Sequence, residues 1–128
     1  MIEKLKELHK NSYSPYSNYP VSAIVVMKDG KEYTGVNVEN ASYGATICAE
    51  RTAILKAVSD GYRKGDFKEI HIMVGSGKLG MPCFICRQVM NEFFEMDDQV
   101  FCYSSKGDHR VFTIQELCTY PFGSDDLK

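Results

Sequence analysis

Apolar residues recur along this chain with two spacings, and the changes between them mark the predicted elements. A spacing of three or four residues, as in Ile2, Leu5 and Leu8, predicts an amphipathic helix, whereas the nearly continuous apolar run at residues 21–27 indicates a buried strand. In chain order the pattern predicts a helix over residues 2–10, strands over 21–27 and 31–39, a helix over 49–60, a strand over 69–75, a helix over 83–95, strands over 99–104 and 110–113, and a short last helix. This order, αββαβαββα, implies a mixed sheet with helices packed on both faces.

Turn and capping residues support these boundaries. Asp29-Gly30 predicts a hairpin between the first two strands, and Lys106-Gly107-Asp108 predicts a second hairpin between the last two. Gly61 is placed to end the helix before it, and Thr113-Ile114-Gln115-Glu116 fits a capping box that opens the last helix. Since no linker, repeat or low-complexity tract interrupts this order, we expect residues 1–128 to form a single domain.

Composition narrows the class of protein without identifying it. The chain has 128 residues, of which 44% are hydrophobic and 25% charged, and these values are typical of a globular domain. Its formal net charge of −2 gives no electrostatic reason to expect a nucleic-acid partner. No apolar run reaches the length that spans a membrane, so we expect no membrane association. Five cysteines without a recognisable signal peptide favour a cytoplasmic location and free thiols.

Three of these cysteines have the spacing of a zinc site. Cys48-Ala49-Glu50 opens one predicted helix, and Pro82-Cys83-Phe84-Ile85-Cys86 opens another. Three thiolates can hold one zinc ion and leave its fourth position for water, and a glutamate two residues past the first ligand can move protons to and from that water. Either half alone is weak evidence, because a C-x-x-C pair can also be a structural zinc half-site or a redox dithiol. The two halves together favour an open catalytic zinc site.

The other candidate ligands do not share that spacing. A closed structural site would need a fourth ligand, for which Cys102, Cys118 and the three histidines are the candidates. We interpret Cys102 and Cys118 as small apolar residues, since buried cysteine usually packs as one. His71 alternates with two isoleucines, which indicates strand packing or a surface position.

Polar residues at the end of the second predicted strand suggest a ligand of a different kind. Strand alternation places Asn37 and Glu39 on one face, where an amide and a carboxylate could bind the vicinal hydroxyls of a sugar. An ordinary polar turn after a strand is the alternative interpretation of this segment.

Taken with these motifs, the chain resembles the cytidine deaminase family over nearly its whole length. The resemblance implies an α/β fold, namely a three-layer α/β/α domain with a mixed sheet of about five strands. It also implies a hydrolase that uses Zn²⁺ to deaminate cytidine and 2′-deoxycytidine in pyrimidine salvage. The segments that carry it are Tyr13 to Ser17, Tyr19 to Val21, Thr34 to Gly44, Ile47 to Ala53, Pro82 to Val89, Pro121-Phe122 and Asp126-Leu127.

The same resemblance implies roles for individual residues. Cys48, Cys83 and Cys86 would bind the metal, and Glu50 would be the catalytic proton shuttle. Asn37 and Glu39 would bind the ribose, and Tyr19 would pack against the base. Arg51 would compensate the charge of the thiolates, and Phe122 would be the tail aromatic that reaches an active site in the assembled oligomer. The all-cysteine ligand set and the short chain resemble the homotetrameric branch of the family. The substrate of these enzymes is a small nucleoside.

Three departures from the family pattern concern the pocket rather than the catalytic groups. Phe84-Ile85 stands where small residues are common, Met81 where serine is common, and Ser22-Ala23-Ile24 where Gly-Ala-Ala is usual. Bulk near the metal could reshape the base pocket or an interface, but we expect compensated repacking of the core around these larger side chains.

Three other functions remain as alternatives. The first is deamination of another aminopyrimidine nucleoside such as blasticidin S. A nucleic-acid-editing deaminase would need a parallel last strand pair, which the hairpin at Lys106-Gly107-Asp108 argues against. The intact Glu50 argues against a zinc-binding module without activity.

Overall fold

The computed structural model describes residues 1–128 and contains a five-stranded sheet with the order β2-β1-β3-β4-β5. The strands are β1 (Val21–Met27), β2 (Glu32–Val36), β3 (Phe67–Val74), β4 (Gln99–Tyr103) and β5 (His109–Thr113). All neighbouring pairs are antiparallel except β3 and β4, which are parallel. The sheet is therefore mixed, as the sequence predicts, and its last pair is the antiparallel hairpin expected from Lys106-Gly107-Asp108.

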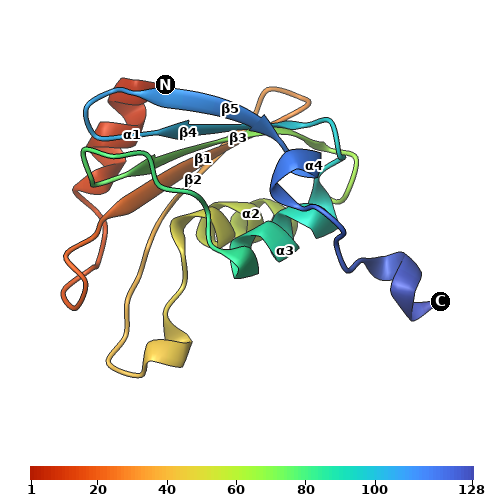
Figure 1. The fold of residues 1–128 in the computed structure, drawn as a ribbon, viewed down its shortest axis with the longest axis horizontal. Coiled ribbons are helices and arrows are strands. Elements are labelled where there is room, and N and C mark those ends of the chain that lie inside the picture. Colours follow the sequence, from red (N-terminus) through yellow and green to blue (C-terminus); the bar gives the residue numbers. More distant parts are fainter.

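Helices cover both faces of the sheet and give the domain three layers (Figure 1). α1 (Ile2–His9) packs on one face, whereas α2 (Ala49–Ser59) and α3 (Phe84–Phe93) lie side by side on the other (Figure 1). α4 (Ile114–Leu117) follows β5, and short 3₁₀ helices over Tyr43–Ala45 and Ser124–Leu127 complete the chain. The α/β/α prediction is thus confirmed. None of the helices combines the length and the apolar character needed to cross a membrane.

Two apolar clusters, one on each face of the sheet, explain the pattern of β1. Ala23, Val25 and Met27 contribute to the large cluster between the sheet and the α2–α3 layer, whereas Ile24 belongs to the smaller cluster beneath α1. All four side chains are fully buried. Because successive residues of a strand point to opposite faces, a strand covered on both faces must be apolar at almost every position.

The predicted turns and caps are present. Gly30 has a φ of 92° in the β1–β2 hairpin and Gly107 has a φ of 92° in the β4–β5 hairpin, a conformation that side-chain-bearing residues rarely adopt. The Thr113 side chain accepts a hydrogen bond from the Glu116 backbone N–H at 3.2 Å, and the Glu116 carboxylate accepts one from the Thr113 N–H at 2.9 Å. This reciprocal pair is the capping box that opens α4.

Two details differ from the sequence predictions. β2 ends at Val36 rather than at residue 39, because Val38 leaves the ladder and forms isolated bridges with Tyr13 and Ile47. The expected repacking of the core around the bulky pair after Cys83 is wrong: Phe84 is 76% exposed and Ile85 62% exposed. Both lie in the first turn of α3 on the side that faces away from the sheet, so they enlarge an apolar surface and leave the core unchanged.

Candidate metal and active site

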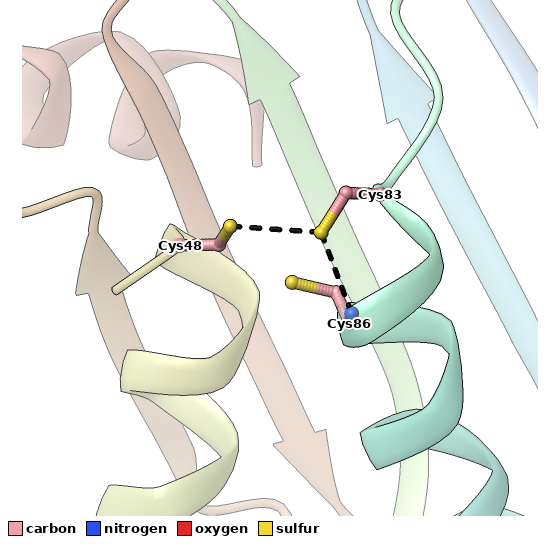
Figure 2. A group of neighbouring side chains, drawn as sticks. All are labelled: Cys48, Cys83 and Cys86. Carbon is pink, nitrogen blue, oxygen red and sulfur yellow. Dashed lines mark hydrogen bonds between the residues drawn. The ribbon is translucent and has the colours of Figure 1, made fainter. Parts of the chain in front are cut away.

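Three cysteines meet where the N-termini of α2 and α3 approach each other (Figure 2). Cys48 is the N-cap of α2, Cys83 is the N-cap of α3, and Cys86 lies in the first turn of α3. The three Sγ atoms all lie within 4.8 Å of one another. The parallel pair β3–β4 requires a crossover through α3, and this crossover brings Cys83 and Cys86 beside α2.

The dimensions and chemistry of this cluster fit a zinc ion. A tetrahedral zinc centre with Zn–S bonds of about 2.3 Å places two sulfurs about 3.8 Å apart. The Sγ atoms of Cys48 and Cys83 are 3.7 Å apart. Thiolates are soft ligands that favour zinc over hard cations such as magnesium. The cluster contains only these three cysteines, so a zinc ion held by them would have its fourth coordination position free for water or substrate.

The surroundings of the cluster favour thiolates. Hydrogen bonds from Cys86, Arg51 and Cys83 lower the pKa of Cys48 to about 5, against the opposing effect of burial. The Arg51 guanidinium lies 3.5 Å from the Cys48 Sγ, and the positive ends of two helices point at the cluster. The hydrogen bond to Cys48, together with burial, raises the pKa of Cys86. Without a metal, one thiolate is therefore stabilised and the second is disfavoured by the first.

Glu50 lies in the first turn of α2 and is buried, with only 4% of its surface exposed. Burial, with a smaller contribution from the negative charge on Cys48, raises the pKa of its carboxyl to about 7, although hydrogen bonds from its own backbone N–H and from the Cys86 thiol act in the opposite direction. A carboxyl with a pKa near neutrality can both accept and donate a proton at physiological pH. Its position beside the cysteine cluster is thus suited to general acid–base chemistry.

The remaining candidate ligands lie elsewhere. Cys102 in β4 and Cys118 after α4 are buried, and neither belongs to the metal-ligating group. Burial raises the pKa of Cys102 to about 11. His71 is buried in β3, with its Nδ1 2.9 Å from the Tyr103 hydroxyl and its Nε2 against the Glu69 carboxylate. These positions agree with the packing roles that the sequence predicts for the three residues.

Asn37 and Glu39 both bind the loop of residues 11–20. The Asn37 side-chain oxygen accepts hydrogen bonds from the Ser12 hydroxyl and, at 2.9 Å, from the Val21 N–H. The Glu39 carboxylate accepts bonds from the Ser17 hydroxyl and from two backbone N–H groups, and these bonds lower its pKa. Asn37 is buried and Glu39 is half-buried, and through these bonds both residues have a structural role here beside any role in binding a ligand.

The two aromatic candidates occupy different places. Tyr19 is 40% exposed, and its carbonyl oxygen accepts a hydrogen bond from the Asn37 amide at 2.9 Å. Phe122 follows α4 and is held through its carbonyl oxygen, which accepts bonds from Gln88 at 2.9 Å and from Asn91 at 3.1 Å. It lines a cavity of about 440 Å³ to which none of the three cysteines nor Glu50 contributes. Within one chain, Phe122 is therefore not brought to the cysteine cluster.

Sequence reasoning missed Ser17, which connects two of the candidates. The Ser17 hydroxyl contacts the Glu39 carboxylate and accepts a hydrogen bond from the Tyr19 N–H at 3.1 Å. A serine in a polar loop belongs to no helical or strand pattern. The only signal in the sequence is that this loop is rich in hydroxyl-bearing residues, which form local hydrogen bonds.

Among zinc enzymes, a three-residue ligand set with a nearby glutamate that does not bind the metal is typical of the deaminases. The comparisons agree with this class. The family described as "Cytidine and deoxycytidylate deaminase zinc-binding region" matches residues 1–103. A cytidine deaminase from Halalkalibacterium halodurans is 39% identical over 127 residues, which cover 99% of this chain and 95% of the relative. One from Mycobacterium tuberculosis is 42% identical over 118 residues, which cover 91% and 82%.

The fold leads to the same family. The crystal structure of a cytidine deaminase from Burkholderia pseudomallei matches with a TM-score of 0.90 and 42% identity, covering 94% of this chain and 95% of that one. The chain belongs to the cytidine and deoxycytidylate deaminase family, and zinc is its cofactor.

Proposed function

We propose that this chain hydrolyses the exocyclic amino group of cytidine and 2′-deoxycytidine, giving uridine or 2′-deoxyuridine and ammonia, as a step of pyrimidine salvage. The observation that carries this proposal is the buried Glu50, whose pKa is raised to about 7 beside a cluster of three cysteines. Family membership supplies the substrate class, and the residues of this chain supply the chemistry.

Cys48, Cys83 and Cys86 would hold the zinc ion. When bound, it supplies a Lewis acid that lowers the pKa of water from about 15.7 to about 7. Three thiolates leave the site with an excess of negative charge, which weakens that effect. The Arg51 guanidinium, 3.5 Å from the Cys48 Sγ, together with the two helix N-termini, offsets part of this charge.

Glu50 moves the protons of the reaction. Its carboxylate accepts a proton from the attacking water, and the resulting acid donates that proton to N3 of the cytosine ring as C4 becomes tetrahedral. A second transfer through the same carboxyl protonates the amino group, which leaves as ammonia. A pKa near 7 suits both directions of transfer, and the burial of Glu50 excludes bulk water that would compete for the proton.

Asn37 and Glu39 are proposed to bind the ribose. Of the hydrogen bonds that Glu39 accepts, the one from the Ser17 hydroxyl is the only one from a side chain. A sugar hydroxyl is the same kind of donor and could take the place of Ser17. Tyr19, at the same loop, would form the wall against which the base packs.

An assembly is proposed to complete the site, and we infer a homotetramer. Cys83 is exposed, and so are the apolar side chains of its sequence neighbours Met81, Phe84 and Ile85. Phe122 is 55% exposed, and the tail after it projects outward from the domain (Figure 1). A neighbouring copy that covers the apolar side chains and donates its Phe122 would enclose the nucleoside. The free thiols are in keeping with a location in the reducing cytoplasm.

The test is the ultraviolet absorbance of cytidine during incubation with purified, zinc-loaded protein. Conversion to uridine lowers the absorbance, and one ammonia should form for each cytidine consumed. The same assay with 2′-deoxycytidine should give a similar change. Unchanged absorbance of both nucleosides, with zinc bound, would overturn the proposed function.

A further inference from the structure

Tyr19 and Pro20 pack against two glycines of the loop that leads from β3 to the metal ligands. Gly75 directly follows β3, and Gly80 lies two residues before Pro82. We propose that Gly80 is a positioning residue of the active site: because it has no side chain, it leaves room for the Tyr19 hydroxyl and so fixes the wall that Tyr19 presents to the base. This inference rests on the proposed function for the identity of the substrate.

The contact at Gly80 leaves no room for a methyl group. A Cβ built on Gly80 would lie 2.6 Å from the Tyr19 hydroxyl oxygen and 3.0 Å from the Val74 Cγ1. Val74 is 4% exposed at the end of β3, so its methyl groups have little free space into which to move. Tyr19 is 40% exposed and is the partner that must move. Overpacking of this kind displaces the more mobile side chain.

The contact at Gly75 is independent and holds the same pair. A Cβ on Gly75 would lie 2.5 Å from the Pro20 Cγ, and the Gly75 N–H donates a hydrogen bond to the Pro20 carbonyl at 2.7 Å. The backbone of Tyr19 is bonded on both sides as well, by Ser17 and Asn37. With its backbone fixed, Tyr19 can move its hydroxyl away from a larger residue 80 only by swinging the whole side chain about the Cα–Cβ bond, since rotation of the ring leaves the oxygen in place.

The Tyr19 hydroxyl also lies beside the segment that leads into the cysteine cluster, because its contact residue Gly80 precedes Cys83 by three positions. Burial raises the pKa of the Tyr19 hydroxyl, and the negative charge of Glu50 raises it further. A displaced Tyr19 side chain would move the proposed wall for the base, whereas the three cysteines, at the start of α2 and α3, would stay in place.

The experiment is a double-mutant cycle of Gly80→Ala and Tyr19→Phe, with Gly44→Ala as the matched control. A Cβ on Gly44 would meet nothing within 4 Å, so this variant carries the same chemical change without the contact. Cytidine kcat and KM, zinc content and thermal unfolding are measured for each variant. We expect Gly80→Ala to retain zinc and to raise KM about tenfold with a smaller change in kcat. The same substitution in the Tyr19→Phe background should raise KM by less, because the oxygen it displaces is gone.

An unchanged KM in Gly80→Ala, or an equal rise in both backgrounds, would overturn the inference, and so would an effect of Gly44→Ala as large as that of Gly80→Ala. If Gly80→Ala does not fold, a folded double variant supports the contact with Tyr19 and an unfolded one overturns it. If the unaltered protein does not turn over cytidine, the proposed function fails, but the double-mutant cycle can still be measured by thermal unfolding. Losses of stability in Gly80→Ala and Tyr19→Phe that add up to the loss in the double variant would refute the contact between the two residues.

Discussion

Cys83 and Cys102 show how position, rather than residue type, decides the chemistry of a thiol. Cys83 caps α3 beside two other sulfurs, whereas Cys102 is enclosed in the apolar core of the sheet. We therefore expect Cys83→Ala to lose zinc and activity together, and to unfold at a lower temperature because metal binding and folding are coupled. Cys102→Ala, a matched change, should keep about one zinc per chain.

Metal analysis of the purified variants checks this pair. Loss of zinc from Cys102→Ala, or full retention of zinc in Cys83→Ala, would show that the ligand set is different. Treatment of the unaltered protein with a chelator should lower its unfolding temperature in the same way as Cys83→Ala.

His71 makes a prediction about the dependence of stability on pH. Burial lowers the pKa of His71 below its ordinary 6.5, although the Glu69 carboxylate opposes the shift. As pH falls below about 6.5, the unfolded chain binds a proton that the folded chain resists. The contribution of His71 to stability is thus complete above that pH and is lost as pH falls through the folded pKa, by at most about 1.4 kcal/mol per pH unit.

Urea unfolding at about pH 7 and about pH 5 measures this effect. The unaltered protein should lose more stability over this interval than His71→Gln does, since glutamine does not titrate. Equal losses in the two proteins, or a His71 imidazole pKa above 6.5 by NMR, would contradict the prediction.

At the scale of elements, the sequence predicted what depends on repeated local patterns. The two-sided burial of β1, the hairpin glycines and the Thr113–Glu116 capping box each leave a local signal, and each is present in the structure. The end of β2 and the exposure of Phe84 depend on contacts between distant segments. Val38 leaves the sheet and exchanges backbone hydrogen bonds with Ile47, while Tyr13 bonds the residues on either side of it, and no pattern within β2 indicates these partners.

The candidate site likewise contains residues that local spacing indicated and contacts that depend on distant segments. Spacing and residue type alone indicated Cys48, Glu50, Cys83 and Cys86, which the fold brings together. The hydrogen bonds of Ser17 and the contact of Gly80 with Tyr19 could not be predicted, because they join the loop of residues 11–20 to segments far along the chain.

The junction between that loop and the end of β2 supports a prediction on substrate choice. Glu39→Ala should lower kcat/KM for cytidine by about 10- to 150-fold, since a charge-assisted hydrogen bond to the sugar is lost. Turnover of free cytosine, which has no sugar, should change much less. Steady-state kinetics with both substrates provides the measurement.

Ser17→Ala is the control for this prediction, because Glu39 also holds the loop. It removes the side-chain bond to Glu39 and leaves the carboxylate available. If Ser17→Ala impairs cytidine turnover as strongly as Glu39→Ala does, loop anchoring rather than sugar binding explains the effect.

At the scale of the whole molecule, the outward tail predicts an active site built from two chains. A chain truncated after Pro121 keeps all candidate ligands and Glu50 but lacks Phe122, and its activity should fall. Co-refolding this form with full-length Glu50→Gln should restore part of the activity, since some mixed sites combine an intact Glu50 with a donated tail. Light scattering should report a tetramer.

Two results would refute this assembly. One is a monomer at assay concentration that is fully active. The other is a mixture of the two forms that shows no more activity than its components measured separately.

The central claim, that buried Glu50 moves the protons of a zinc-dependent deamination, is tested most directly by the turnover number of Glu50→Gln at confirmed zinc content. Glutamine keeps the size of the side chain and cannot accept a proton, so zinc should remain at about one per chain while kcat for cytidine falls about 100- to 10,000-fold. A Glu50→Gln protein that binds zinc and deaminates cytidine at nearly the original rate would contradict the account.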